Sequence, residues 1–170
     1  MTNLTANLQI DEKLDWISEA KTLEEQVART KQVAQMDATF ATLMRMAVTE
    51  KEKMCGLPAG VPSTYKPKTD VPNGTSLTTV RQELRRLKNY LSDGSYKDIS
   101  SVKREGIWLG IIEGFHWKEA TILTHIKDQT LLVIYPNMRE VLMKLGAPIS
   151  VPDNIPAKKM TSRDHPRRKL

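Results

Sequence analysis

Apolar residues recur every three or four positions over most of the chain, the spacing of one face of an α-helix. The pattern predicts helices over 10–20, 22–48 and 77–91, with either a break or a bend at Asp37. It predicts three more over 101–114, 117–127 and 136–145. No long stretch alternates with a period of two, so we expect an all-α fold built as a small helical bundle.

Residues that favour helix ends mark several of these boundaries. Thr22 and Glu25 fit a capping box, in which each side chain bonds a free backbone N–H at a helix start. Ser76 is expected to cap the helix that follows it, and Gly146 suits the left-handed residue after the last helix. The run 131–135 has the composition of a strand but is too isolated to form a sheet.

The stretch 54–76 interrupts the helical pattern. It holds four prolines and three glycines, and proline lacks the N–H that helices and central strands need. The chain is therefore expected to divide into four parts. These are an N-terminal helical arm (1–53), a Pro/Gly-rich extended connector (54–76), a C-terminal helical domain (77–146) and a basic tail (147–170) without a stable fold.

The positive charge of the chain is concentrated at its C-terminal end. The 170 residues include 26 Lys and Arg against 20 Asp and Glu, a net charge of +6. Residues 151–170 contribute most of that excess, and they contain three prolines and few large apolar side chains. Such a segment buries too little apolar surface to offset its ordering entropy, which is why we predict a disordered tail.

Few residues support catalysis, metal binding or a cofactor. The single cysteine, Cys55, excludes an intrachain disulfide and a multi-cysteine zinc site. The three histidines do not have ligand spacing, and no nucleotide-binding or hydrolase motif occurs. Three acids, Glu105, Glu113 and Glu119, approach one another in a bundle without a second feature that favours acid–base chemistry. We therefore expect a non-enzymatic protein with neither cofactor nor metal.

No membrane segment is predicted. The longest apolar stretch, 106–112, is far shorter than the roughly 20 residues of a membrane span. The first residues lack the charged and then apolar order of a signal peptide, so an intracellular and reducing environment is expected.

The strongest hint of a function is a row of cations on the predicted helix 77–91. A leucine stripe on one face leaves Arg81, Arg85, Arg86 and Lys88 opposite, and Lys103 with Arg104 extends them into the next helix. Cations in this arrangement bind phosphate backbones through counterion release. The alternative is an ordinary solvated helix face with local ion pairs, such as Glu83 with Arg86.

A second basic cluster lies in the tail and is a further candidate contact to nucleic acid. Its alternatives are a solubilising extension and a peptide that docks on a partner. Aromatic residues are not interleaved with these charges, so stacking on single strands is not indicated. The tail cations are Lys158, Lys159, Arg163, Arg167, Arg168 and Lys169.

The helices on either side of Phe115–Trp117 invite comparison with a helix-turn-helix. A recognition helix needs exposed side chains that reach base edges. The second helix here offers only lysines and threonines, so this indication is weak.

The second half of the chain contains a Leu-Pro-x-Gly-x-Pro segment at 57–62, an Arg-rich helix with Arg81, Arg85 and Arg86, and Lys-Arg-Glu at 103–105. With these motifs it resembles a family of small uncharacterised proteins from large contractile-tailed bacteriophages. The resemblance covers about residues 10–145 and is strongest from 57 to 136. His116-Trp117 departs from the His-Pro of many relatives, and the basic tail is an addition. The matching positions are Leu57, Pro58, Gly60, Pro62, Tyr65 and Pro67, then Arg81, Arg85 and Arg86, then Lys103, Arg104, Glu105 and Glu113, and finally Glu119, Ala120, Lys127, Asp128 and Tyr135.

The resemblance implies a phage origin and little chemistry, and three functions follow from it. The first is an accessory protein that binds nucleic acid or a nucleoprotein complex, in the host cytoplasm during infection. The second is a virion structural or assembly protein of the head, neck or tail. The third is an inhibitor of a host protein, in which the proline-rich connector is either the epitope or a packed brace. The oligomeric state is not indicated.

Overall fold

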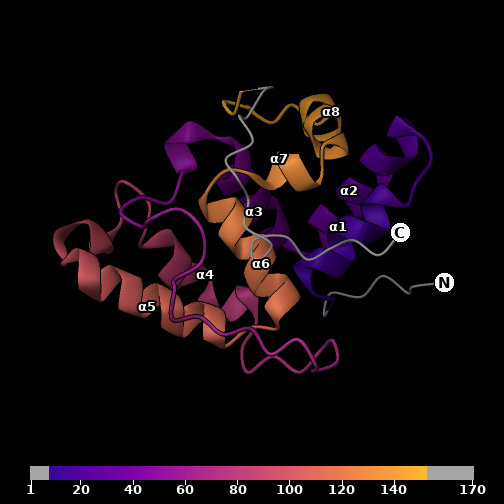
Figure 1. Cartoon of the computed structure of the whole chain (residues 1–170). Helices are drawn as coiled ribbons and strands as arrows, with labels where there is room; N and C mark the ends of the chain where they lie inside the picture. The colour runs from indigo at the N-terminus through magenta and orange to yellow at the C-terminus, as the bar shows by residue number, and fades with distance from the viewer. Residues whose placement is uncertain (1–7, 153–170) are drawn as a thin grey trace.

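The structure is a computed structural model that describes residues 8–152, and the regular secondary structure of these residues is helical (Figure 1). The all-α prediction is confirmed: residues 8–152 contain no strand. Two short 3-10 turns, Glu50–Glu52 and Ser95–Asp98, join the helices. The α-helices within residues 8–152 are α1 (Ile10–Ser18), α2 (Leu23–Met36), α3 (Ala38–Val48), α4 (Val80–Lys88), α5 (Ser101–Glu113), α6 (Trp117–Lys127), α7 (Leu131–Ile134) and α8 (Asn137–Lys144).

Capping residues set most of the helix boundaries. The hydroxyl of Thr22 accepts a hydrogen bond from the backbone of Glu25 at the start of α2. Asp37 separates α2 from α3, because its extended backbone ends α2 and its carboxylate caps α3. Gly146 has a φ of +78° after α8, as predicted.

The fourth helix begins later than predicted, and Ser76 does not cap it. Thr79 and Gln82 form the capping box of α4 instead. Ser76 accepts a hydrogen bond from the backbone of His116, and the backbone N–H of Leu77 donates to Gly114. These bonds hold residues 76–77 against the turn before α6, and the Leu77 side chain is 91% exposed instead of continuing the leucine stripe.

Helix α6 lies at the centre of the fold and contacts α1, α3, α5 and α7. Its apolar side chains, among them Ala120, Leu123 and Ile126, are buried in one core that also holds Leu14 and Phe40. Residues of the predicted arm (1–53) and of the predicted C-terminal domain (77–146) therefore share one core.

The connector 54–76 is held on this core by side chains from the second half of the chain. The Lys127 ammonium donates to the carbonyl of Pro58 at 2.8 Å and pairs with the neighbouring Asp128. The Asp128 carboxylate accepts from the backbone N–H of Gly60 at 2.8 Å. This agrees with the interpretation of the connector as a packed brace.

Residues 147–152, which the sequence pattern assigns to the tail, pack on the folded part, and the rest of the predicted tail lies outside the described residues. The backbone N–H of Ser150 donates to the carbonyl of Val48 at 2.8 Å, and the hydroxyl of Thr49 donates to Pro148. Arg139 donates to the carbonyl of Val151, whose side chain is buried. Within residues 8–152, no helix is long and apolar enough to cross a membrane.

The substitution Lys127→Met tests whether the buried cation holds the connector. The Lys127 side chain is only 2% exposed, so its removal leaves Asp128 and the Pro58 carbonyl without their partner. We expect the free energy of unfolding to fall by about 3 kcal/mol in urea titrations.

Lys53→Met is the matched control, because Lys53 forms an exposed pair with Glu50. Its cost is expected to stay within about 0.5 kcal/mol. Equal losses in the two variants would contradict the proposed role of Lys127.

Candidate nucleic-acid interface and the polar cluster beside it

Three of the predicted cations form a row on the outer side of α4. Arg81, Arg85 and Lys88 are exposed at spacings of four and three residues, and Val80 and Leu87 on the other side of the helix are buried. Among residues 8–152, the side chains of Arg85 and Lys88 form no ion pair with an acid. Arg81 lies 3.7 Å from Asp37, but its side chain remains 65% exposed. We call these three residues the α4 row.

The other folded cations lie outside this row. Arg86 forms an ion pair with Glu83 at 3.0 Å, the local pair expected of an ordinary solvated helix face. Lys103 is exposed in the first turn of α5. The tail cations Lys158, Lys159, Arg163, Arg167, Arg168 and Lys169 lie outside the described residues.

Arg104 has a structural role that the sequence did not reveal. Its guanidinium donates to the carbonyls of Gly56 at 3.1 Å and Ile99 at 2.7 Å, with longer bonds to Tyr96 and Lys97. The side chain therefore joins the connector to the turn before α5. The sequence predicted that Arg104 extends the row of cations. Its guanidinium is instead engaged by these backbone carbonyls.

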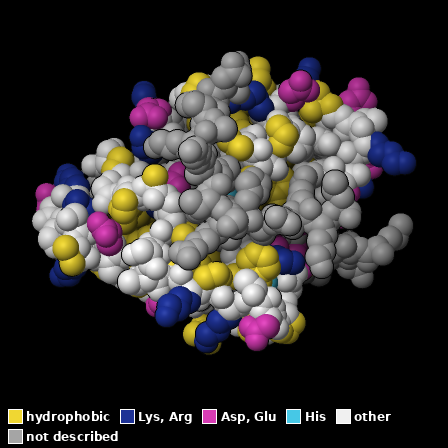
Figure 2. Space-filling model, in the orientation of Figure 1, with side chains coloured by type: hydrophobic (Ala, Val, Ile, Leu, Met, Phe, Trp, Pro, Cys, Tyr) yellow, Lys and Arg dark blue, Asp and Glu magenta, His cyan; other side chains and the backbone are white. Residues whose placement is uncertain are grey.

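On the face seen in Figure 2, charge is mixed: Lys and Arg side chains are spread among Asp and Glu and do not merge into one patch. The weak helix-turn-helix interpretation is wrong, because Thr124 and Lys127 of α6 are buried in the core.

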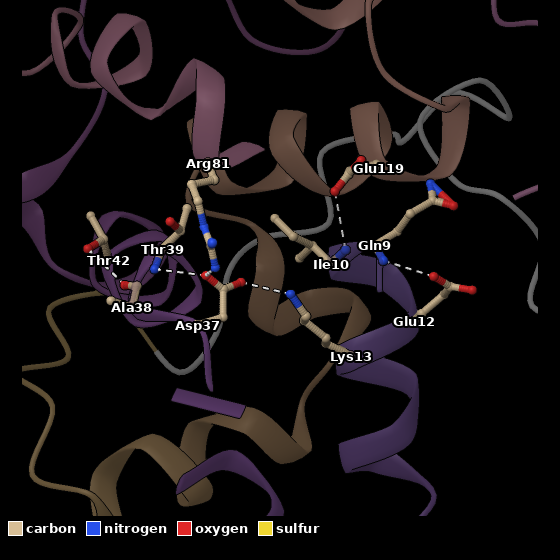
Figure 3. A network of polar contacts seen from close by, with 10 residues as sticks. All are labelled: Gln9, Ile10, Glu12, Lys13, Asp37, Ala38, Thr39, Thr42, Arg81 and Glu119. Atoms are coloured by element: carbon tan, nitrogen blue, oxygen red, sulfur yellow. Dashed lines mark hydrogen bonds and ion pairs between the residues drawn. The ribbon is translucent and has the colours of Figure 1, made fainter. Parts of the chain in front are cut away.

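A cluster of polar side chains lies beside the α4 row, where the first turns of α1, α3, α4 and α6 meet (Figure 3). Lys13, Asp37, Arg81 and Glu119 line a cavity of about 250 Å³ there. The ammonium of Lys13 donates to Asp37 at 2.7 Å, and the backbone N–H of Thr39 donates to the other oxygen of Asp37 at 3.1 Å. With Arg81 at 3.7 Å, the Asp37 carboxylate thus contacts residues of α1, α3 and α4.

The two acids of this cavity have opposite pKa shifts. Burial opposes ionisation of Asp37, but the hydrogen bond and charge of Lys13 outweigh it, so the pKa of Asp37 lies below its usual value. Among the described residues, Glu119 accepts one backbone hydrogen bond, from Ile10 at 3.3 Å. Burial raises the pKa of Glu119 to about 7.

Two further polar groups near the start of α1 are incompletely satisfied. The side-chain nitrogen of Gln9 and one carboxylate oxygen of Asp11 are buried without a hydrogen-bond partner among the described residues. Burial, with help from Glu12 and Asp15, raises the pKa of Asp11 to about 6. The interface between α1 and α6 therefore holds two carboxyl groups that are costly to ionise.

The sequence interpretation missed the Lys13–Asp37 pair and misjudged the acids. Glu105 and Glu113 are exposed on α5, whereas Glu119 is buried on α6, so the three acids share no site. The one signal in the sequence for this pair was Asp37, a good capping residue between two helical patterns. Nothing in the α1 pattern distinguishes Lys13 from a solvated lysine. Within residues 8–152, no three His, Cys, Asp or Glu side chains are grouped as metal ligands.

The raised pKa of Glu119 predicts a pH-dependent stability. A carboxyl whose pKa is about 7 when folded and near 4.5 when unfolded adds stability below pH 4.5, which is lost as the pH rises through 7. Glu119→Gln keeps an acceptor for Ile10 and removes the charge. We expect this variant to be more stable than the wild type at pH 8, by about 2–3 kcal/mol, with little difference at pH 4.5.

Urea titrations at pH 4.5, 6 and 8 measure this difference. The exposed Glu105→Gln is the control and should follow the wild type at each pH. A stability difference for Glu119→Gln that does not change with pH would show that the Glu119 carboxyl is not a titrating group in this range.

Comparison with known proteins identifies a family. Residues 13–132 match DUF6433, a family of unknown function. The match spans α1 to the start of α7 and includes the connector, the α4 row and the polar cluster. No curated protein and no solved structure matches the chain. Because the match covers well over half of the sequence, the chain belongs to the family DUF6433.

Proposed function

We propose that this protein is a non-enzymatic accessory protein that binds the phosphate backbone of nucleic acid through the α4 row. The observation that carries the proposal is the position of Arg81, Arg85 and Lys88, which are exposed one turn apart on a helix whose other side is buried. The packed side fixes the helix, so the cations are presented without a large ordering cost. The phage resemblance supports a role in the host cytoplasm during infection.

The dimensions of the row suit a phosphate backbone. Seven residues of α-helix span about 10 Å at 1.5 Å per residue. Successive phosphates of one duplex strand advance about 3.4 Å along the axis, so the row matches a short run of phosphates. Arg81 can join it, since its side chain is 65% exposed and Asp37, 3.7 Å away, already has the closer Lys13 as its partner.

The expected binding is independent of sequence. Base edges are read by side chains such as Asn, Gln and Arg that enter a groove. The one amide side chain near the start of α4, Gln82, is engaged in the capping box with Thr79. Phosphate contacts alone give an affinity that falls steeply with salt.

The triple variant Arg81→Gln, Arg85→Gln and Lys88→Gln tests the proposal. Glutamine keeps a good helix propensity and removes the charges. We expect weaker binding to a duplex in fluorescence anisotropy. We also expect the slope of log K against log salt to become shallower by about 0.9 for each phosphate that the variant no longer neutralises.

The control variant replaces three exposed lysines elsewhere, Lys21, Lys66 and Lys144, with Gln. It has the same net charge as the triple variant but an intact α4 row. If both variants lose affinity equally, binding follows net charge and the proposal fails. It also fails if the wild type does not bind at low salt.

A further inference from the structure

A second surface of the protein is an apolar groove between α2, α3 and α8. The groove has a volume of about 510 Å³, within the range of about 300–1,000 Å³ typical of binding clefts. Its floor is formed by Phe40 and Met44 of α3 and by Leu142 of α8. The segment 145–148 closes one end of it. We call this the α2–α8 groove.

The groove arises from the way the helices pack. Helix α2 contacts both α3 and α8, so it forms a wall common to the two. Small side chains, Ala34 of α2 and Ala41 of α3, line the walls and leave the space between them open. A larger residue at either position would fill the groove.

The rim of the groove is positive. Lys31 and Arg45 are the two charged residues in its lining, both are cations, and both are exposed. Arg45 pairs with Glu52 at 3.4 Å, but its side chain remains 46% exposed.

We propose that the α2–α8 groove docks a segment of a partner protein that presents apolar side chains flanked by carboxylates. Charge complementarity selects this class of partner. The apolar floor takes apolar anchors, and Lys31 and Arg45 attract the acids on either side of them. A polynucleotide would leave the apolar floor unfilled, and a basic segment would be repelled at the rim.

The groove and the α4 row lie apart on the molecule. In Figure 1, α2 and α8 lie on one side of the central helix α6, and α4 and α5 lie on the other. A partner in the groove therefore leaves the α4 row open. The proposal does not depend on nucleic-acid binding, and either one can fail alone.

Selection from a displayed library of random 16-residue peptides on the full-length chain tests the proposal. We expect the enriched peptides to be acidic, with apolar residues spaced by three or four. The best peptide, labelled for anisotropy, should bind Lys31→Glu/Arg45→Glu at least tenfold more weakly than the wild type. The matched control, Lys21→Glu/Lys66→Glu, changes the charge by the same amount at exposed sites outside the groove and should bind normally.

A photo-crosslinking residue in place of Gln35, an exposed position in the groove lining, identifies the occupant directly. A crosslink to the peptide supports the proposal. A crosslink to a second copy, or to another part of the same chain, would overturn it. A library that yields no enriched peptides, or basic ones, would also overturn it, as would equal loss of binding in the control.

Discussion

The burial of α6 is the constraint on which the rest of the structure depends. A helix covered on most sides cannot leave its polar side chains to water, so each needs a partner inside the protein. Glu119 accepts from the backbone of α1, His125 pairs with Thr130 at 2.8 Å, and Lys127 bonds the connector. Two segments distant in the sequence, the start of α1 and the connector, are thus positioned by polar residues of one helix. The same burial raises the pKa of Glu119, so the ionised form of this carboxyl is costly at neutral pH.

Several positions that carry the phage-protein resemblance turn out to hold the connector. Lys127 bonds the carbonyl of Pro58, Asp128 bonds the N–H of Gly60, and Arg104 bonds the carbonyl of Gly56. A proline-rich segment cannot satisfy its own backbone in a helix, so it needs such donors and acceptors from elsewhere. These motif residues have a structural role in this chain. The candidate surfaces for function are therefore the exposed residues of α4 and the α2–α8 groove.

Local signals predicted the helices well, and tertiary contacts explain what the sequence could not give. Periodicity and capping residues placed α5, α6 and α8 close to their observed bounds because those signals act within one or two turns. The shared core and the order of 147–152 depend on partners about 100 residues away, as in the bond between Ser150 and Val48. Lys13 and Arg104 also depend on tertiary contacts, with partners 24 and 48 residues away. Each looks like a solvated cation in the sequence, yet one lies buried against Asp37 and the other binds backbone carbonyls.

The α4 row also has structural reasons for its charges. Arg85 and Lys88 occupy the last turn of α4, where cations interact favourably with the helix dipole by about 0.3–1 kcal/mol each. Arg81 occupies the first turn, where the dipole disfavours a cation, and the nearby Asp37 accounts for its position. All three cations thus contribute modestly to the fold and remain largely exposed. Binding of phosphate would be an additional role, so affinity and stability should respond independently to substitutions in the row. A large loss of affinity with a small loss of stability is the combination that a binding surface, and not a structural one, produces.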